Sequence, residues 1–390
     1  MYFIDTIFFI FYFILRCLGK KFPLKHGLSD TKFKKILIVR LDHIGDVMMT
    51  TPIIKALKNK YTEARIDLLV GSWAKRVVED NPYVDTLYIY DAPWWANIRP
   101  GEKRENVFSL SHIRRLYGIL SVLRKQKYDL MIEPRGDFRH LLLFGYFANV
   151  RYILSFDRSG GRYLLSEVVS FDENQNEMEK NSVLLSVLGI CNVDKKVDIY
   201  VSKEEENRAK ALLERNGILG KKIVIFSVGS RKHLKRWPID KFLSLASWIV
   251  ETYLDTVVIF VGSSADRFLS IEIKKGVNLG KVYDFIGMTD IKEVMALLRM
   301  AALIVANDGP VSHMCSSVNT PAIILFGPTQ AERFRPYGEH ITVVQKIYDC
   351  CPCLLVYCKH TNSESISACM QAIEVDDICN IIKDKAFLIK

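Results

Sequence analysis

Short runs of aliphatic and β-branched residues alternate with longer amphipathic stretches along the chain from Lys34 onward. Strand-length apolar runs separated by helical periodicity predict βαβ units, and such units build a mostly parallel sheet. The pattern fills two successive halves, and 390 residues exceed what one hydrophobic core usually supports. We therefore expect the α/β class, with two doubly wound, Rossmann-like lobes.

The periodicity also predicts where the elements lie. In the first half, strands are expected at 35–40, 66–70, 86–90, 129–133 and 151–154, with helices at 47–60, 75–80, 111–127, 138–149 and 179–188. In the second half, strands are expected at 223–228, 256–261, 282–285, 303–306 and 321–326, with helices at 204–216, 238–252, 265–275, 291–300 and 311–318. A last helix at 375–385 has no strand after it and could cross back to the first lobe.

Composition shifts along the chain predict four segments. A hydrophobic and basic segment, 1–33, precedes a first Rossmann-like domain at 34–200. A second Rossmann-like domain follows at 201–346, and a cysteine-rich tail with the last helix occupies 347–390.

The first segment favours association with a membrane. Residues 2–15 are almost all apolar and are followed by Arg16, Lys20, Lys21 and Lys25. The run is short for a span, which needs about 20 residues, and it contains Asp5. An aromatic run beside a basic flank suits the bilayer interface, and if it spans, the positive flank places the main body in the cytoplasm. We expect a protein that is peripheral to or anchored in a membrane, with its main body in the cytoplasm, and a helix packed on the fold is the alternative.

Lysine and arginine exceed aspartate and glutamate by 54 to 44, a net charge of +10. This favours an anionic partner, whether nucleotide, phosphorylated lipid, membrane surface or nucleic acid, although solubility alone is the simpler explanation.

Six of the nine cysteines lie between Cys350 and Cys379, which indicates a thiol cluster in a reducing compartment. Their spacing is compatible with zinc or an iron–sulfur cluster, but it is irregular, and buried cysteines or a redox-labile loop fit equally. We assign no metal.

A strand, a tight turn at Gly45 and a helix starting at Asp46 form the first candidate site. An aspartate there is expected first as a helix N-cap. The functional alternative is a general base, since a sugar hydroxyl is a poor nucleophile until its proton is removed. Asp42 in the same turn is the rival candidate, and Pro52 is expected to kink the helix or delay its start.

The second candidate site follows the strand expected at 223–228. Gly229 and Ser230 let backbone N–H groups approach a ligand, and positive charge follows at Arg231, Lys232, Lys235 and Arg236. A departing nucleoside diphosphate needs such neutralisation as negative charge grows on its bridging oxygen. Because this basic loop connects a strand to a helix, we favour phosphate binding over a solvated basic loop or a nucleic-acid patch.

The turn after the strand at 303–306 offers a second helix start. Asn307 or Asp308 is expected as N-cap, with Pro310 at the first helical position. N–H groups of Gly309, Val311 and Ser312 could reach phosphate, while the pattern alone favours a core position for His313. A third turn at 327–330 belongs to the same sheet edge, and no cluster of aspartates is placed to clamp Mg²⁺ on a diphosphate.

These motifs together resemble glycosyltransferase family 9, the ADP-heptose:lipopolysaccharide heptosyltransferases, from about residue 34 to 377. The resemblance is carried by 38–47 with Thr51 and Pro52, by 235–238, 307–313, 326–329 and 335–338, and by the cysteines and Met370 of the tail. It implies the GT-B fold, with a cleft between the lobes, and a metal-independent, inverting reaction that needs no cofactor. Asp46 then matches the catalytic base and Lys235 the donor-phosphate lysine. Asp308 and Gly309 match the donor-binding turn, and Gly229 and Ser230 the pair facing the diphosphate.

By this resemblance the chain transfers a heptose from an ADP-activated donor to a lipopolysaccharide core or lipid acceptor at the membrane surface, and it binds no nucleic acid. Two alternatives stay open. One is a GT-B transferase with another nucleotide-sugar, and the other is a non-catalytic, basic, membrane-tethered protein that binds nucleotides or anionic lipid. The apolar N-terminal extension and a slightly longer loop at 231–234 depart from the family pattern.

Overall fold

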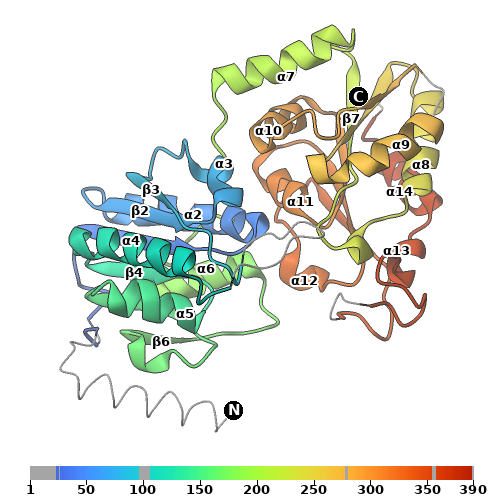
Figure 1. Ribbon diagram of the computed structural model, residues 1–390. Coiled ribbons are helices and arrows are strands. Elements are labelled where there is room, and N and C mark those ends of the chain that lie inside the picture. Colours follow the sequence, from blue (N-terminus) through green and yellow to red (C-terminus); the bar gives the residue numbers. More distant parts are fainter. Residues whose placement is uncertain (1–22, 26, 96–105, 277–279, 354–356, 389–390) are drawn as a thin grey trace. The chain divides into compact units, whose positions relative to one another are not determined.

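The computed structural model describes residues 23–25, 27–95, 106–276, 280–353 and 357–388 (Figure 1). The chain divides between Asp198 and Ile199 into two compact units, which are taken in turn below. The apolar run at the N-terminus, for which a membrane role is expected, lies outside the described residues. Within the described part, none of the helices has the length and apolar character that a membrane crossing requires.

The first unit is built on a six-stranded sheet that is parallel throughout, in the order β3-β2-β1-β4-β5-β6. This is the Rossmann strand order, in which the chain reverses its direction of winding between the first and fourth strands. The strands are β1 (Lys35–Arg40), β2 (Arg65–Val70), β3 (Thr86–Ile89), β4 (Leu130–Glu133), β5 (Tyr152–Asp157) and β6 (Glu167–Ser170).

The helices of the first unit are α2 (Ile44–Lys60), η1 (Ser72–Ala74), α3 (Lys75–Val78), α4 (Leu110–Gln126), α5 (Phe138–His140), the π-helical η2 (Leu141–Phe147), η3 (Arg162–Leu164) and α6 (Glu177–Ser186). One face of the sheet packs on a core in which Leu37, Val39, Leu123, Phe144 and Ile153 are fully buried. This core holds the carboxyl ends of β1 and β4 rigidly side by side.

Helix α2 begins earlier than the sequence indicates, at Ile44, and runs through Pro52 as one element. Pro52 has no N–H to donate to the carbonyl of Met48, four residues earlier. The hydroxyl of Thr51 donates to that carbonyl instead, at 2.7 Å. The prediction that Pro52 would delay the helix is therefore wrong, because a neighbouring side chain replaces the missing donor.

The second unit repeats the same order, β12-β11-β10-β7-β8-β9, again with all strands parallel. Its point of reversal lies between β7 and β10. The strands are β7 (Lys222–Ser227), β8 (Thr256–Val261), β9 (Val282–Asp284), β10 (Leu303–Asn307), β11 (Ala322–Phe326) and β12 (Ile341–Gln345). Two Rossmann-like units in one chain make up a GT-B fold, as expected.

The helices of the second unit are α7 (Lys203–Arg215), η4 (His233–Lys235), α8 (Ile239–Thr252), η5 (Ser264–Asp266), α9 (Arg267–Gly276), α10 (Ile291–Met300), α11 (Pro310–Met314), η6 (Cys315–Ser317), α12 (Ala331–Phe334), α13 (Ala368–Gln371) and α14 (Val375–Asp384). Helix α14 packs against α8, and its Ile378 and Ile382 are fully buried in this unit's core. The last helix therefore completes the core of its own unit, and the expectation that it crosses to the first is wrong.

Candidate functional site

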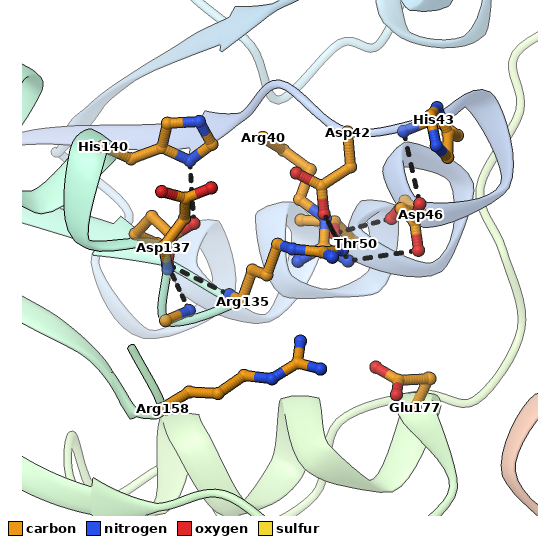
Figure 2. A network of polar contacts seen from close by, with 12 residues as sticks. Arg40, Asp42, His43, Asp46, Thr50, Arg135, Asp137, His140, Arg158 and Glu177 are labelled. Carbon is orange, nitrogen blue, oxygen red and sulfur yellow. Dashed lines mark hydrogen bonds and ion pairs between the residues drawn. The ribbon is translucent and has the colours of Figure 1, made fainter. Parts of the chain in front are cut away.

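Polar side chains gather in the first unit where β1 and β4 end. Arg135, two residues beyond β4, places Nη1 3.0 Å from Oδ2 of Asp42, two residues beyond β1 (Figure 2). Nη2 of Arg40 lies 3.5 Å from the same oxygen. Ligands of doubly wound sheets bind where the winding reverses, at the carboxyl ends of the strands. The two arginines thus build a charged site at the position that the topology favours.

Asp42 is fully buried within this group. Burial by itself would raise the pKa of its carboxyl, but Arg40, Arg135 and His140 outweigh that effect and hold the pKa below its ordinary value. The indole N–H of Trp73 donates to the Asp42 carbonyl at 2.6 Å and fixes the turn from outside. A carboxylate that is enclosed and neutralised in this way is a poor proton acceptor, so the rival base is better understood as a structural anion.

Asp46 lies on the first turn of α2 and keeps 20% of its side chain exposed. Its Oδ2 accepts the backbone N–H of His43 at 3.2 Å, and its Oδ1 lies 3.6 Å from Nη2 of Arg40. The N-cap of α2 is His43, so the expectation that Asp46 itself caps the helix is wrong. Asp46 is the third residue of the helix and reaches back to the cap, which fixes its carboxylate while leaving it open to a ligand.

The turn after β4 is organised by Glu133, which is fully buried. Its Oε2 accepts the backbone N–H groups of Arg135, Gly136 and Asp137, while Oε1 lies 3.0 Å from Nδ1 of His140. A carboxylate that satisfies three successive N–H groups closes the turn tightly. This closed turn fixes the backbone position from which the Arg135 side chain extends.

Two tryptophans pack beside this turn. The guanidinium of Arg135 lies 4.2 Å from the ring centre of Trp95, and that of Arg139 lies 5.1 Å from the ring centre of Trp94. The indole N–H of Trp94 donates to Nε2 of His140 at 3.3 Å. Cation–π stacking restrains both guanidinium groups, and each is also paired with a carboxylate, Arg135 with Asp42 and Arg139 with Asp137.

Three strand ends meet at the corresponding place in the second unit. Nζ of Lys235 lies 2.7 Å from Oδ2 of Asp308, and the hydroxyl of Thr329 donates to the same oxygen. The hydroxyl of Ser230 donates to the Asp308 carbonyl at 3.2 Å. The turns after β7, β10 and β11, which the sequence assigns to one sheet edge, are therefore joined through Asp308.

Gly229 stands where a side chain does not fit. A Cβ there would lie 2.4 Å from Oδ2 of Asp266. Asp266 is itself held by Nη2 of Arg236 at 3.1 Å, and Nε of Arg236 donates to the Ser230 carbonyl at 2.9 Å. The small pair 229–230 is thus backed by a buried ion pair that sets the path of its backbone.

The remaining predicted donor-site residues lie on or next to α11. Gly309, with extended backbone, is the N-cap and Pro310 the first helical residue, so neither Asn307 nor Asp308 caps this helix. Asn307 instead accepts the backbone N–H of Trp237 at 3.0 Å. Val311 is half-buried, and Ser312 and His313 are buried. The structure brings all of these residues to the carboxyl end of β10, beside that of β7.

The cysteine-rich tail has no disulfide within its described residues. Cys350 offers a ligand atom within 4.8 Å of those of Asp349 and His360. His360 and Lys359 both contact the Asp349 carboxylate, at 3.0 and 3.1 Å. One pocket is lined by five cysteines: Cys350, Cys351, Cys353, Cys358 and Cys369. Among the described residues, the group of three possible metal ligands is Asp349, Cys350 and His360, which includes one of these thiols.

Sequence reasoning did not find Arg40, Glu133, Arg135 or His140. Arg40 and Glu133 are the last residues of β1 and β4, Arg135 lies in the turn after β4, and His140 is the last residue of α5. Arg40 and Glu133 each end a strand that is apolar on both faces, so their side chains are expected to be buried. Charged residues are rarely buried without a partner, and this pattern could have identified both residues.

The chain matches the model of glycosyltransferase family 9 (heptosyltransferase) over residues 118–363, a range that begins after Asp46. It is 26% identical over 303 residues to lipopolysaccharide heptosyltransferase 3 of Escherichia coli, covering 76% of this chain and 84% of the relative. The fold is similar to that of a family 9 glycosyltransferase from Veillonella parvula, with a TM-score of 0.73, 19% identity, and 91% and 97% of the two chains covered. It is also similar to E. coli ADP-heptose lipopolysaccharide heptosyltransferase II, with a TM-score of 0.69, 18% identity, and 91% and 98% covered.

Proposed function

The chain belongs to glycosyltransferase family 9, the heptosyltransferases, and on that premise we propose that it transfers a heptose from an ADP-activated donor to a lipopolysaccharide core or lipid acceptor. The names of its relatives support this substrate pair, since one is an ADP-heptose lipopolysaccharide heptosyltransferase. The single observation that carries the proposal is the position of Asp46, an accessible carboxylate 3.6 Å from Arg40, at a switch point of the kind that binds ligands.

Asp46 acts as the general base in this proposal. It takes the proton of the acceptor hydroxyl, and the oxygen then attacks the anomeric carbon of the heptose as the bond to ADP breaks. An in-line displacement of this kind inverts the anomeric configuration. The partly exposed carboxylate supports the assignment, because Asp42 in the same turn is enclosed by two arginines.

Arg40 contributes a second feature to this site. It is buried, and among the described residues its Nε and Nη1 have no hydrogen-bond partner. Buried donors are rarely left unsatisfied in a native protein unless a ligand or water fills the role. An oxygen of the acceptor next to the reacting hydroxyl would satisfy them.

Lys235 holds the departing diphosphate in the second unit, with Gly229, Ser230 and the N-terminal residues of α11 supplying N–H groups. The negative charge that grows on the bridging oxygen is neutralised by the ammonium group and by the backbone dipoles. Asp308 pairs with Lys235 at 2.7 Å and so fixes the ammonium group before the donor arrives. The reaction proposed here requires no metal ion.

The test is the transfer of heptose from ADP-heptose to a lipid A–Kdo acceptor, read by mass spectrometry. In Asp46→Asn we expect kcat to fall by about 10²–10⁴, the usual contribution of a positioned general base. The affinity for ADP should stay within about threefold, since the amide oxygen still accepts the N–H of His43. Near-normal turnover in this variant would remove the base assignment.

Two other outcomes decide between the remaining functions. Transfer from a different nucleotide-sugar would keep the mechanism and change the donor. Binding to oligonucleotides that falls steeply with salt, without transfer from any donor, would favour a basic binding protein. We propose further that the enzyme works on the cytoplasmic face of the inner membrane, because its acceptor is a lipid.

A further inference from the structure

Helix α4 of the first unit is unusually exposed for a helix that packs on a sheet. Within its 17 residues only His112 and Leu123 are buried. Large apolar side chains point instead into solvent, with Leu110 86%, Tyr117 74% and Ile113 48% exposed. Phe108, just before the N-cap Ser109, is 81% exposed.

These side chains form one continuous surface. Leu110, Ile113 and Tyr117 are spaced three and four residues apart and therefore lie along one side of the helix. Phe108 extends the stripe beyond the helix start. Single exposed apolar residues are common, but a contiguous apolar patch of this kind marks an interaction site.

The charge of the same segment has one sign. Residues 106–127 contain no aspartate or glutamate, and their five formal positive charges come from Arg114, Arg115, Arg124, Lys125 and Lys127. Arg114, Arg124, Lys125 and Lys127 are exposed. The partner of this surface is therefore both apolar and anionic.

We propose that α4 docks the first unit onto the surface of an anionic lipid bilayer. The stripe of Phe108, Leu110, Ile113 and Tyr117 enters the boundary between headgroups and acyl chains, and the basic residues bind lipid phosphates. An amphipathic helix with aromatic and aliphatic residues on one side and arginine and lysine on the other binds membranes in this way. Each basic residue near an anionic leaflet adds to the attraction.

Other occupants fit this surface less well. In a symmetric dimer of this chain, the same patch would meet itself and bring two segments of like charge together. A nucleic acid would neutralise the arginines and stack bases on Phe108 and Tyr117, but it would leave Leu110 and Ile113 exposed to water. A bilayer satisfies both the apolar stripe and the charge.

This surface goes beyond the proposed transferase function and beyond the N-terminal run for which a membrane role is expected. It depends on neither the donor nor the base assignment. The surface lies in the same unit as Asp46. The unit proposed to bind the lipid acceptor would therefore also contact the membrane.

The test uses the full chain and hydroxyl-radical footprinting, which labels exposed side chains residue by residue. Vesicles are made of diphytanoyl-phosphatidylglycerol and diphytanoyl-phosphatidylcholine in equal parts, since saturated chains do not propagate lipid peroxidation. Radicals that the lipids scavenge are corrected by a reference residue in the same sample. We expect the labelling of Phe108, Leu110 and Tyr117 to fall severalfold on the vesicles. Phe268 in the second unit, which is 46% exposed, serves as the reference and should keep its rate.

Three results would overturn the proposal. The first is unchanged labelling of Phe108 and Tyr117 while the protein is bound to the vesicles, which would place the contact elsewhere, as on the N-terminal run. The second is equal protection on vesicles of phosphatidylcholine alone. The third is protection by an oligonucleotide but not by vesicles.

A charge reversal supplies the second measurement. Arg124→Glu with Lys125→Glu should weaken co-sedimentation with the anionic vesicles by at least about tenfold, because two attractive charges become repulsive. Lys203→Glu with Lys210→Glu on α7 makes the same change in net charge at exposed positions and should have a much smaller effect. If both pairs of substitutions weaken vesicle binding equally, the binding depends only on the net charge of the protein, and α4 is not the docking site.

Discussion

Arg135 and Asp42 tie together the ends of the two central strands of the first sheet, with Nη1 and Oδ2 3.0 Å apart. Asp42 is fully buried, and its other cationic neighbour, Arg40, is the residue that also approaches Asp46. The Arg135–Asp42 ion pair therefore affects how strongly Arg40 interacts with the proposed base, Asp46.

We predict that Arg135→Met destabilises the protein by about 2–4 kcal/mol, because it leaves a buried carboxylate with one partner fewer. The free energy of unfolding in urea measures this. Adding Asp42→Asn to the same variant should recover part of the loss, since the uncompensated charge is removed. Arg162→Met is the control, because its pair with Asp157 is exposed and should contribute less than about 1 kcal/mol. A double variant no more stable than Arg135→Met would contradict the coupling.

Lys235→Ala should weaken ADP binding by about 10- to 150-fold, the value of one hydrogen bond between charged groups. Isothermal titration calorimetry measures the affinity. The matched control is Lys232→Ala, which removes the same charge from an exposed position of the same loop. Equal losses in the two variants would mean that the loop acts only through its net charge.

Chelation of divalent cations with EDTA should leave the transfer rate unchanged when a soluble acceptor fragment is used. The physical reason is that the Asp308 carboxylate is already engaged by Lys235 and Thr329, and the ammonium group supplies the positive charge that a metal would otherwise bring. Loss of activity that Mg²⁺ restores would show that the leaving group needs a metal.

Asp137 provides a prediction on pH. Burial favours its protonated form, but the hydrogen bond from Arg139 and the charges of His140 and Arg139 lower the pKa to about 2. Because the pKa is depressed in the folded state, the carboxylate stabilises the protein above about pH 4, and this contribution is lost as the pH falls toward 2. Asp137→Asn should therefore cost on the order of 1–2 kcal/mol at pH 7, and the difference from the parent should shrink between pH 5 and about pH 3.

Asparagine keeps the cap on the Arg139 N–H, so this variant isolates the charge. Asp137→Ala is the companion, and it should add a loss of about 1 kcal/mol that does not change with pH. Urea titrations at each pH give both values. A difference between Asp137→Asn and the parent that is constant with pH would contradict the assignment.

Gly229→Ala should weaken ADP binding and lower the free energy of unfolding by about 1–3 kcal/mol, because the new Cβ would lie 2.4 Å from the Asp266 carboxylate. Gly118→Ala, on an exposed turn of α4 with no atom within 4 Å of the new Cβ, should be neutral or stabilising by up to about 1 kcal/mol. Thermal unfolding compares the two. A Gly229→Ala protein as stable as Gly118→Ala would mean that Asp266 moves aside without cost.

The sheets were predictable from the sequence because their central strands have apolar interiors, such as 36–39 in β1 and 223–226 in β7. The edge strands β3 and β9 were also predicted, but the edge strands β6 and β12 were not. β6 (Glu167–Ser170) and β12 (Ile341–Gln345) are only partly buried, so neither shows the unbroken apolar run that marks an interior strand. The helix expected at 138–149 is a short α5 followed by the π-helical η2, and a 3.6-residue period does not reveal such a change in hydrogen bonding.

The donor-side turns were predictable for a different reason. Glycine, proline and serine at strand ends fix backbone geometry locally, so 229–230 and 308–310 could be found by inspection. The charged network of the first unit depends on contacts between residues about 90 positions apart, such as Asp42 and Arg135. No local pattern encodes such a pair, and only the fold brings it together.

Both halves use the same strand order, and each encloses an apolar interior of its own. The junction at Asp198 and Ile199 is therefore a natural crossover for building hybrid enzymes. Under the proposed function, joining residues 1–198 to the corresponding second half of a relative would exchange the donor-binding residues, Lys235 among them, and would retain the proposed base, Asp46.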